Sequence, residues 1–132
     1  IWDVTNATVG SGSWVVQTTV DAENFDRELH SGDLDGSNIS WPVYMSAGRY
    51  VLVISYRIGG DQGICDIDID ATEVASVNMA TGTGSYETED IENIDVSTSG
   101  VKTIKLRADG KTGTKYHLHP TFVMFVRVGD VP

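Results

Sequence analysis

The stretch Arg49-Tyr50-Val51-Leu52-Val53-Ile54-Ser55-Tyr56-Arg57 decides the fold class. Its residues are mostly β-branched or aromatic, and apolar side chains occupy both odd and even positions, which is typical of a strand covered on both faces. Ser46-Ala47-Gly48 before it and Gly59-Gly60-Asp61 after it supply turns. We therefore predict a central β-strand over residues 49–57.

The next segment, residues 64–70, alternates between apolar and acidic residues. Cys65, Ile67 and Ile69 form the apolar set, and Asp66, Asp68 and Asp70 form the acidic set. Because successive strand residues point to opposite faces, we expect a half-buried strand whose acidic face is solvated. Lys105 and Arg107 share a face of another predicted strand and can pair with it.

Further segments with strand patterns are separated by clusters of Gly, Ser, Asp and Asn. They cover residues 2–9, 14–20, 40–45, 72–79, 86–96, 101–108 and 115–128. The 14 scattered glycines leave little room for a helix, and the best candidate, 87–92, is short and acidic. We predict an all-β fold, a jelly-roll-type β-sandwich of two antiparallel sheets, as a single domain over residues 1–132.

Charge and hydropathy exclude two classes of partner. The formal net charge of -10 repels nucleic-acid backbones. The sequence contains no apolar run near the ~20 residues that a membrane-spanning helix needs. The chain begins with Ile1 and shows no leader pattern, which is typical of a processed segment. Cys65 is the single cysteine, so no disulfide within the chain is expected.

The pattern of segments 46–56 and 67–70 resembles the middle of a carbohydrate-binding-module jelly roll. In that family a Gly-x-Tyr strand, here Gly48-Arg49-Tyr50, precedes a strand that ends near an Asp-Gly turn. Ala71 stands where the family often has Gly. Gly100 to Arg107 is similar to the family's Gly-x-His-Thr-Leu strand, and Phe122 to Val128 resembles its closing strand. Pilus, virion and tail-fibre modules share this pattern, and no ligand-binding motif matches.

Catalytic signatures are absent from the sequence. It contains no Gly-x-Ser-x-Gly, no His-Glu-x-x-His and no Gly-rich phosphate loop. We therefore predict that the protein is not an enzyme, and no motif indicates an organic cofactor.

Two groups of residues offer metal ligands. Asp33, Asp35 and Asn38 place oxygen atoms around Gly36, as a calcium loop requires, although a hydrogen-bonded surface turn uses the same residue types. His117 and His119 share one face of a predicted strand, with His30 as a third ligand for a metal ion. Solvent-facing or hydrogen-bonded histidines are the default interpretation, and a metal site is the alternative.

Aromatic residues are the candidates for glycan binding. Trp41, beside Pro42, and Tyr86, after the Gly-rich loop, are the ones that we expect to be exposed and to stack on a sugar. Two sequons, Asn6-Ala7-Thr8 and Asn38-Ile39-Ser40, would accept glycans in a secreted protein.

The N-terminal stretch 1–9 is strand-like, but no hairpin turn joins it to the next strand-like segment. It can complete its own sheet or be exchanged with a neighbouring subunit. We predict a structural subunit of an extracellular, cell-surface or virion assembly, such as a filament or pilus-like fibre. Its partner would be a second copy of the chain, and its interface would hold Ile1, Trp2, Val4 and Val9, with the tail 128–132. The alternative is a non-catalytic carbohydrate-binding module, with glycans as partners.

Overall fold

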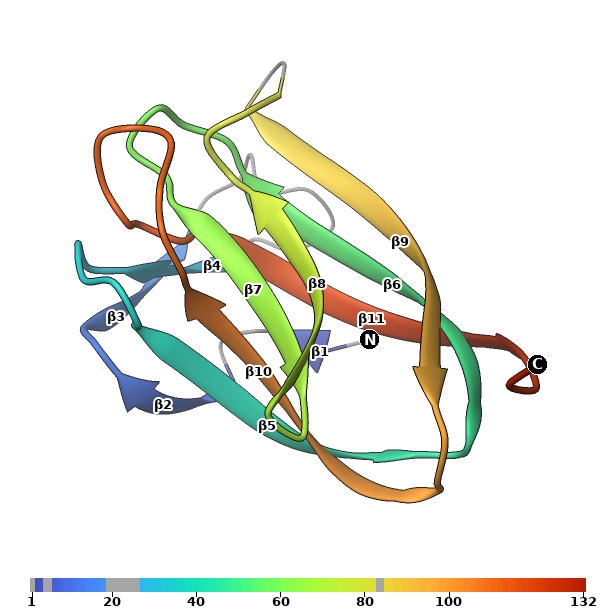
Figure 1. Cartoon of the computed structure of the whole chain (residues 1–132). Coiled ribbons are helices and arrows are strands. Elements are labelled where there is room, and N and C mark those ends of the chain that lie inside the picture. The colour runs from blue at the N-terminus through green and yellow to red at the C-terminus, as the bar shows by residue number, and fades with distance from the viewer. Residues whose placement is uncertain (1, 4–5, 19–26, 83–84) are drawn as a thin grey trace.

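Two antiparallel sheets face each other in the computed structural model, which describes residues 2–3, 6–18, 27–82 and 85–132 (Figure 1). The first sheet has the order β1 (Trp2–Asp3), β11 (Pro120–Gly129), β6 (Gly48–Arg57) and β9 (Tyr86–Val96). The second has the order β2 (Thr8–Ser11), β5 (Asn38–Met45), β10 (Gly100–Ala108), β7 (Ile64–Ile69) and β8 (Thr72–Asn78). A separate ribbon pairs β3 (Trp14–Thr18) with β4 (Arg27–Ser31). The all-β, jelly-roll sandwich prediction is confirmed.

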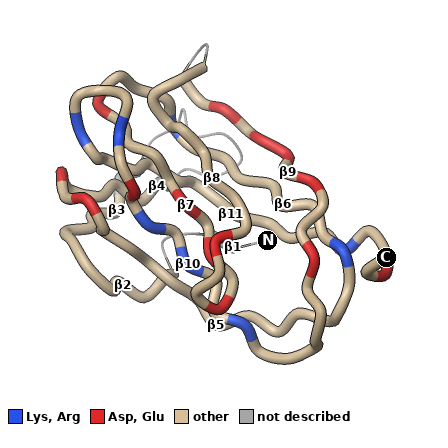
Figure 2. The backbone as a smooth tube through the Cα atoms, viewed as in Figure 1, with Lys and Arg blue, Asp and Glu red and all other residues tan. Residues whose placement is uncertain are grey.

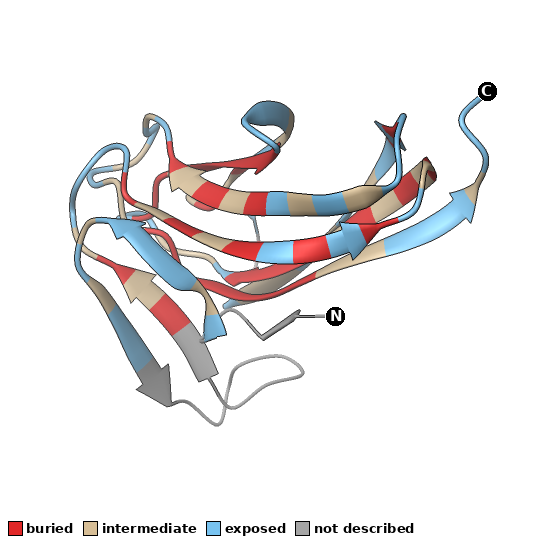
Figure 3. Cartoon of the chain, turned by 90° about the horizontal axis from the view of Figure 1, so that it is seen from below, coloured by how far each residue is buried: buried red, intermediate tan, exposed pale blue. Residues whose placement is uncertain are grey.

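The core lies between the two sheets, because each strand turns its alternate apolar side chains inward. In β6, which lies between β11 and β9, the inward side chains are Tyr50, Leu52, Ile54 and Tyr56, all buried. Val51 and Val53 on the opposite face are half-buried. Figure 3 shows this alternation of buried and exposed positions along the strands. The described residues include no helix long and apolar enough to span a bilayer.

The ends of the chain differ from the predicted strands. The described parts of the 1–9 segment join different sheets of the same chain, since Trp2 pairs with Val123 of β11 and Val9 pairs with Ile39 of β5. The last strand begins at Pro120 rather than at residue 115. The segment before it is fixed by single contacts instead, such as the isolated bridge between Gln62 and His117.

The outer face of β7 is not solvated, so that prediction is wrong. Asp66 is 3% exposed and Asp68 is 5% exposed, because Arg107 of β10 extends over them. Its guanidinium lies 3.2 Å from Asp66 Oδ2 and 2.8 Å from Asp68 Oδ2, which confirms the predicted pairing for Arg107. Figure 2 shows the basic positions of β10 beside the acidic positions of β7. The acidic side chains of β7 are therefore shielded from solvent by the long side chain of Arg107 on the neighbouring strand.

The guanidinium of Arg107 contacts three carboxylates, because it also lies 3.0 Å from Asp109 Oδ2, beside Asp66 and Asp68. It cannot neutralise all of them. Burial and the hydrogen bond with Asp109 raise the pKa of Asp66 to about 6, whereas the hydrogen bonds with Asp66 and Arg107 lower the pKa of Asp109. Below about pH 6, Asp66 therefore holds a proton, which it shares with the carboxylate of Asp109. On the inner side of the same strand, burial raises the pKa of the Cys65 thiol well above its usual range.

Candidate functional site

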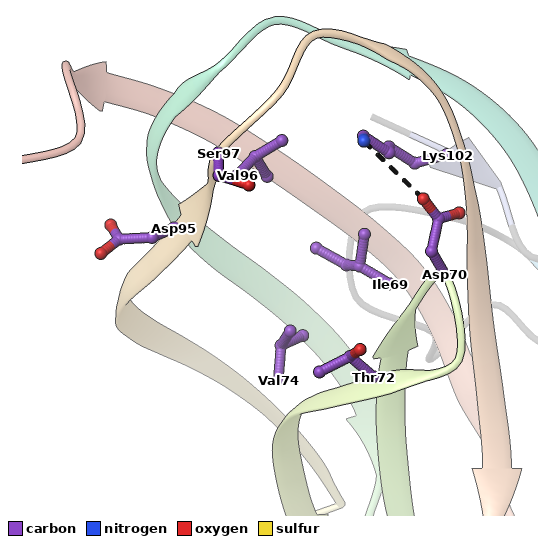
Figure 4. A pocket seen from close by; sticks show the side chains of 8 residues that line it. All are labelled: Ile69, Asp70, Thr72, Val74, Asp95, Val96, Ser97 and Lys102. Carbon is purple, nitrogen blue, oxygen red and sulfur yellow. Dashed lines mark ion pairs between the residues drawn. The ribbon is translucent and has the colours of Figure 1, made fainter.

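A pocket of about 200 Å³ opens at the end of the sandwich where β7 turns into β8 and β9 leads to β10 (Figure 4). It is lined by Ile69, Asp70, Thr72, Val74, Asp95, Val96, Ser97 and Lys102. Ile69 and Val96 are buried and form its apolar floor. Its volume is below the ~300–1,000 Å³ of sites for drug-sized ligands, so it suits one small group.

The turn at the rim of this pocket is a two-residue hairpin loop, because Ile69 pairs with Thr72. Its central residues, Asp70 and Ala71, have φ angles of 50° and 65°. Two positive φ angles in succession are the mark of a type I′ turn, which matches the twist of the strands that it joins. The turn places Asp70 above Thr103 of β10, whose N–H donates to Asp70 Oδ1 at 2.8 Å.

The charged side chains that line the pocket do not all point into it. Lys102 Nζ lies 3.7 Å from Asp70 Oδ2, and Figure 4 shows this ion pair at the mouth. Asp95 points away from the cavity in the same view. Its carboxylate accepts from Arg49 Nε at 2.7 Å, and this hydrogen bond lowers the pKa of Asp95. The pocket can therefore donate and accept hydrogen bonds through Lys102 and Asp70.

An exposed apolar surface adjoins this pocket on the outer face of the second sheet. We call it the Tyr44 surface, and its members are Pro42, Tyr44, Val101 and Thr103, which are all exposed. Tyr44 pairs with Val101, and Pro42 pairs with Thr103. Tyr44 is 67% exposed and Val101 is 70% exposed. Thr103 also bonds to Asp70, so Asp70 belongs to both the surface and the pocket rim.

Among the Phe, Trp and Tyr residues whose exposure the structure describes, Tyr44 is the exposed one. A flat ring on a rigid strand can stack on the apolar face of a sugar while its hydroxyl stays solvated. Trp41 was one of the two rings expected to be exposed, with Tyr86, and for Trp41 that prediction is wrong. Trp41 is 6% exposed and lies in the core with Val43 and Met45, so strand alternation puts Tyr44 outside. That alternation was the signal that could have found Tyr44.

The other predicted glycan-binding and interface residues are dispersed. Tyr86 is partly buried at the start of β9, opposite Arg57, at the far end of the sandwich. Val9 of β2 is 49% exposed. Ile1 and Val4 lie outside the described residues, and Trp2 is described only through its backbone pairing with β11. Residues 128–132 follow the end of β11, with Val128 exposed.

The predicted calcium ligands hold a loop together. Asp33 Oδ1 accepts from the N–H of Tyr116 at 2.9 Å, and Asp35 Oδ1 accepts from the N–H of Gly110 at 2.9 Å. Asn38 Nδ2 donates to the carbonyl of Gly36 at 3.0 Å. These contacts are those of a hydrogen-bonded turn, the interpretation that the sequence favours for this segment. Of the two sequon asparagines, Asn6 is exposed and Asn38 is partly buried.

The structure brings together the three histidines that the sequence suggests as one set of metal ligands. His30 comes from β4, and His117 and His119 come from the segment before β11. One nitrogen of each ring lies within 4.8 Å of the others. We call these residues the histidine cluster. Among the described residues, no other group of three histidine, cysteine or acidic side chains lies as close.

Comparison with solved structures identifies the fold of the chain. No protein-family model and no curated protein matches the chain. The fold is similar to part of a Paenibacillus xanthan lyase, with a TM-score of 0.78 and 15% identity over 96% of this chain and 13% of that one. The chain thus spans a small part of that protein.

Two further solved structures match over nearly their whole length. The CBM36-1 domain of a multidomain xylanase from the hindgut metagenome of Trinervitermes trinervoides gives a TM-score of 0.73 and 15% identity, covering 96% of this chain and 95% of that one. The carbohydrate-binding module CBM36 in complex with calcium and xylotriose gives a TM-score of 0.70 and 19% identity, covering 95% and 98%. At these identities the likeness establishes the fold.

The predicted role as a structural subunit of a filament, pilus-like fibre or virion appendage is contradicted by this comparison. The two structures that match over nearly their whole length are carbohydrate-binding modules. The sequence pattern misled because period-two strands are common to sandwiches of both kinds, and strand patterning carries no information on what a sandwich binds. The chain has the jelly-roll β-sandwich fold of carbohydrate-binding modules.

Proposed function

We propose that this chain is a non-catalytic module that binds a neutral polysaccharide through the Tyr44 surface. The observation that carries the proposal is the exposed ring of Tyr44 on a rigid strand. Pro42 and Val101 beside it extend the apolar area that a sugar ring can cover. Thr103 and Asp70 supply hydrogen-bonding groups at the edge of this area.

The charge of the chain favours a neutral ligand. A net charge of -10 raises the cost of bringing an anionic polymer to the surface. A xylan-type chain meets no such barrier, and the family 36 module solved with xylotriose supports this choice. The polymer would be met outside the cell, which gives the module an extracellular or cell-surface location.

Two related expectations stay predictions. Glycosylation of Asn6 and Asn38 requires secretion from a cell with the necessary machinery. Calcium binding at Asp33, Asp35 and Asn38 requires these side chains to share an ion while they hold backbone N–H groups. The calcium in the xylotriose complex supports an ion in this fold.

Affinity electrophoresis tests the proposal, with xylan, xanthan or dextran cast into the gel. We expect xylan to retard the wild type. Tyr44→Ala should weaken retardation about 10-fold or more, or about 1.4 kcal/mol, because the stacking ring is gone. Tyr86→Ala removes the same side chain at the opposite end and serves as the matched control.

A Tyr44→Ala variant that migrates like the wild type in xylan would remove the Tyr44 surface from the proposal. Lys102→Met distinguishes that surface from the pocket, because it removes the amino group at the pocket mouth and leaves Tyr44 in place. A wild type that no polymer retards would overturn the function itself.

A further inference from the structure

The histidine cluster lies at the end of the sandwich opposite the Tyr44 surface, and one pair of its nitrogens has the spacing of two ligands on a metal ion. His30 Nε2 and His117 Nδ1 are 3.2 Å apart. Ligand nitrogens on a tetrahedral zinc ion are separated by about 3.3 Å, given bonds of about 2.0–2.1 Å. The widest separation in the cluster, at most 4.8 Å, would have to shorten by about 1.5 Å, which ring rotation can supply.

The backbone sets the three rings in place. Ser31 N–H donates to the carbonyl of Leu118 at 3.0 Å, and Leu118 N–H donates to Ser31 Oγ at 2.8 Å. Leu118 is buried in the core, so its neighbours His117 and His119 both point to the other side. His30 precedes Ser31 and therefore lies against them, with its ring centroid 4.7 Å from that of His117 and 3.9 Å from that of His119.

Neutral imidazole carries the lone pair that a metal ion needs, so each ring of the histidine cluster can supply one ligand nitrogen. In the hydrogen bond between His30 Nε2 and His117 Nδ1, one of the two nitrogens carries a proton. When a metal ion binds, that proton would move to the solvent or to the other nitrogen of the same ring.

A fourth ligand is available from the neighbouring loop. Asp61 Oδ2 lies 3.6 Å from His117 Nδ1, and its side chain is half exposed. The carboxylate can bind the ion directly or through a water molecule, and its charge offsets that of Arg57 nearby. Three imidazoles and one carboxylate match the preferences of zinc, copper or nickel rather than those of calcium, which takes six to eight oxygen ligands.

We infer that His30, His117 and His119, with Asp61, form a binding site for one divalent transition-metal ion, zinc above all. The ion would fasten β4 to the segment before β11, which the described backbone joins through Ser31 and Leu118. This site does not rest on the proposed function, since the Tyr44 surface lies at the other end of the sandwich.

Titration of the metal-free full chain tests the site, with Zn²⁺, Co²⁺ and Ca²⁺ as separate probes. We expect one equivalent of Zn²⁺ to bind and to raise the Tm, and Co²⁺ to give the visible absorption bands of a tetrahedral site. Ca²⁺ at the same concentration should not compete with Zn²⁺ here. His117→Ala should weaken Zn²⁺ binding by about 100-fold or more, since even the partners that only orient a metal ligand are worth about 10–100-fold.

Two variants complete the experiment. Asp61→Asn should weaken Zn²⁺ binding less than His117→Ala does. Asp90→Asn removes an exposed charge from β9 and controls for general attraction of cations to this acidic chain. Dichroism spectra confirm that each variant is folded, and His117→Ala should still be retarded by xylan if the wild type is. Equal Zn²⁺ affinity of the wild type and His117→Ala, or Co²⁺ without tetrahedral bands, would overturn the inference.

Discussion

The two ends of the sandwich are built differently although the same strands run between them. At the Tyr44 end, β7 and β8 are joined by two residues, and an aromatic ring stands in solvent. At the histidine end, longer loops cross, and side chains of Asp33, Asp35 and Ser31 bind their backbone N–H groups. Strand β10 reaches both ends, from Gly100 to Ala108.

This difference separates two kinds of site. A ring on a strand is positioned by the regular ladder, so its geometry survives changes in nearby loops. The histidine cluster depends on a few specific hydrogen bonds between segments that are 87 residues apart in the sequence. We therefore expect substitutions at the histidine end to change its site through the backbone, and those at the Tyr44 end to act on local contacts alone.

The largest expected effect concerns Asp66, in the sheet that connects the two ends. Its folded pKa of about 6 lies above the value of 3.8 for an ordinary Asp, so its stabilising proton is fully held below pH 3.8 and is lost as the pH rises through 6. This loss costs about 2 kcal/mol between pH 4 and pH 7. The Asp66→Asn variant has no carboxyl group to ionise at this position, so it should not show this loss of stability.

Urea unfolding at pH 4 and pH 7 measures this effect. The free energy of unfolding of Asp66→Asn relative to the wild type should be higher at pH 7 than at pH 4 by about 2 kcal/mol. Asp90→Asn, which removes an exposed carboxylate of β9, is the control, and its pH profile should be parallel to that of the wild type. Parallel pH profiles for all three proteins would show that Asp66 holds no proton in the folded state.

The next prediction concerns a substitution that removes a hydrogen bond at the histidine end of the sandwich. Ser31→Ala leaves the buried N–H of Leu118 without its side-chain acceptor, and a lost buried hydrogen bond costs about 1–3 kcal/mol. Urea unfolding should show this loss at pH 7. Zn²⁺ binding should weaken as well, while retardation by xylan should not change. Loss of xylan retardation in the folded variant would show that the two ends are coupled.

The smallest effect sharpens the Tyr44 end. Ala71 has a φ of 65°, where an L side chain costs about 1–2 kcal/mol relative to glycine. Ala71→Gly should therefore raise the free energy of unfolding, by about 1 kcal/mol after the greater chain entropy of glycine is subtracted. Gly36→Ala is the mirror experiment at the other end. Gly36 has a φ of 85° with open space around it, so the substitution tests backbone strain alone.

An Ala71→Gly variant less stable than the wild type would show that strain at this turn is not the deciding factor. Thermal unfolding of both variants gives the comparison directly, since their expected Tm shifts have opposite signs.

The fold could be read from the sequence where the side chains alternate regularly. Residues 86–96 form a strand with the predicted bounds, and residues 49–57 form the predicted central strand. Strand β4 was missed because Arg27 to Ser31 contains one apolar residue, Leu29. Its strand structure depends on pairing with β3 rather than on its own pattern.

The candidate sites were predictable to different degrees. Alternation around Trp41 contains the information that Tyr44 points outward, and proximity to Pro42 was the wrong guide. The sequence suggested His30, His117 and His119 as one set of ligands, and the structure brings their rings together, while metal binding there stays a prediction. The assembly of this set could not be derived, because it requires the Ser31 and Leu118 backbones to lie together. The burial of Asp66 likewise depends on where Arg107 extends, which a strand pattern does not specify.

The placement of Cys65 in the core has a practical consequence. Its sulfur is fully buried and its thiol stays protonated, so neither oxygen nor an alkylating reagent can reach a reactive thiolate while the chain is folded. The molecule should therefore stay free of intermolecular cross-links in air. A second cysteine engineered into the exposed loop around Gly60 would be the one that reacts, which makes the wild-type chain a ready background for attaching a single fluorophore or spin label.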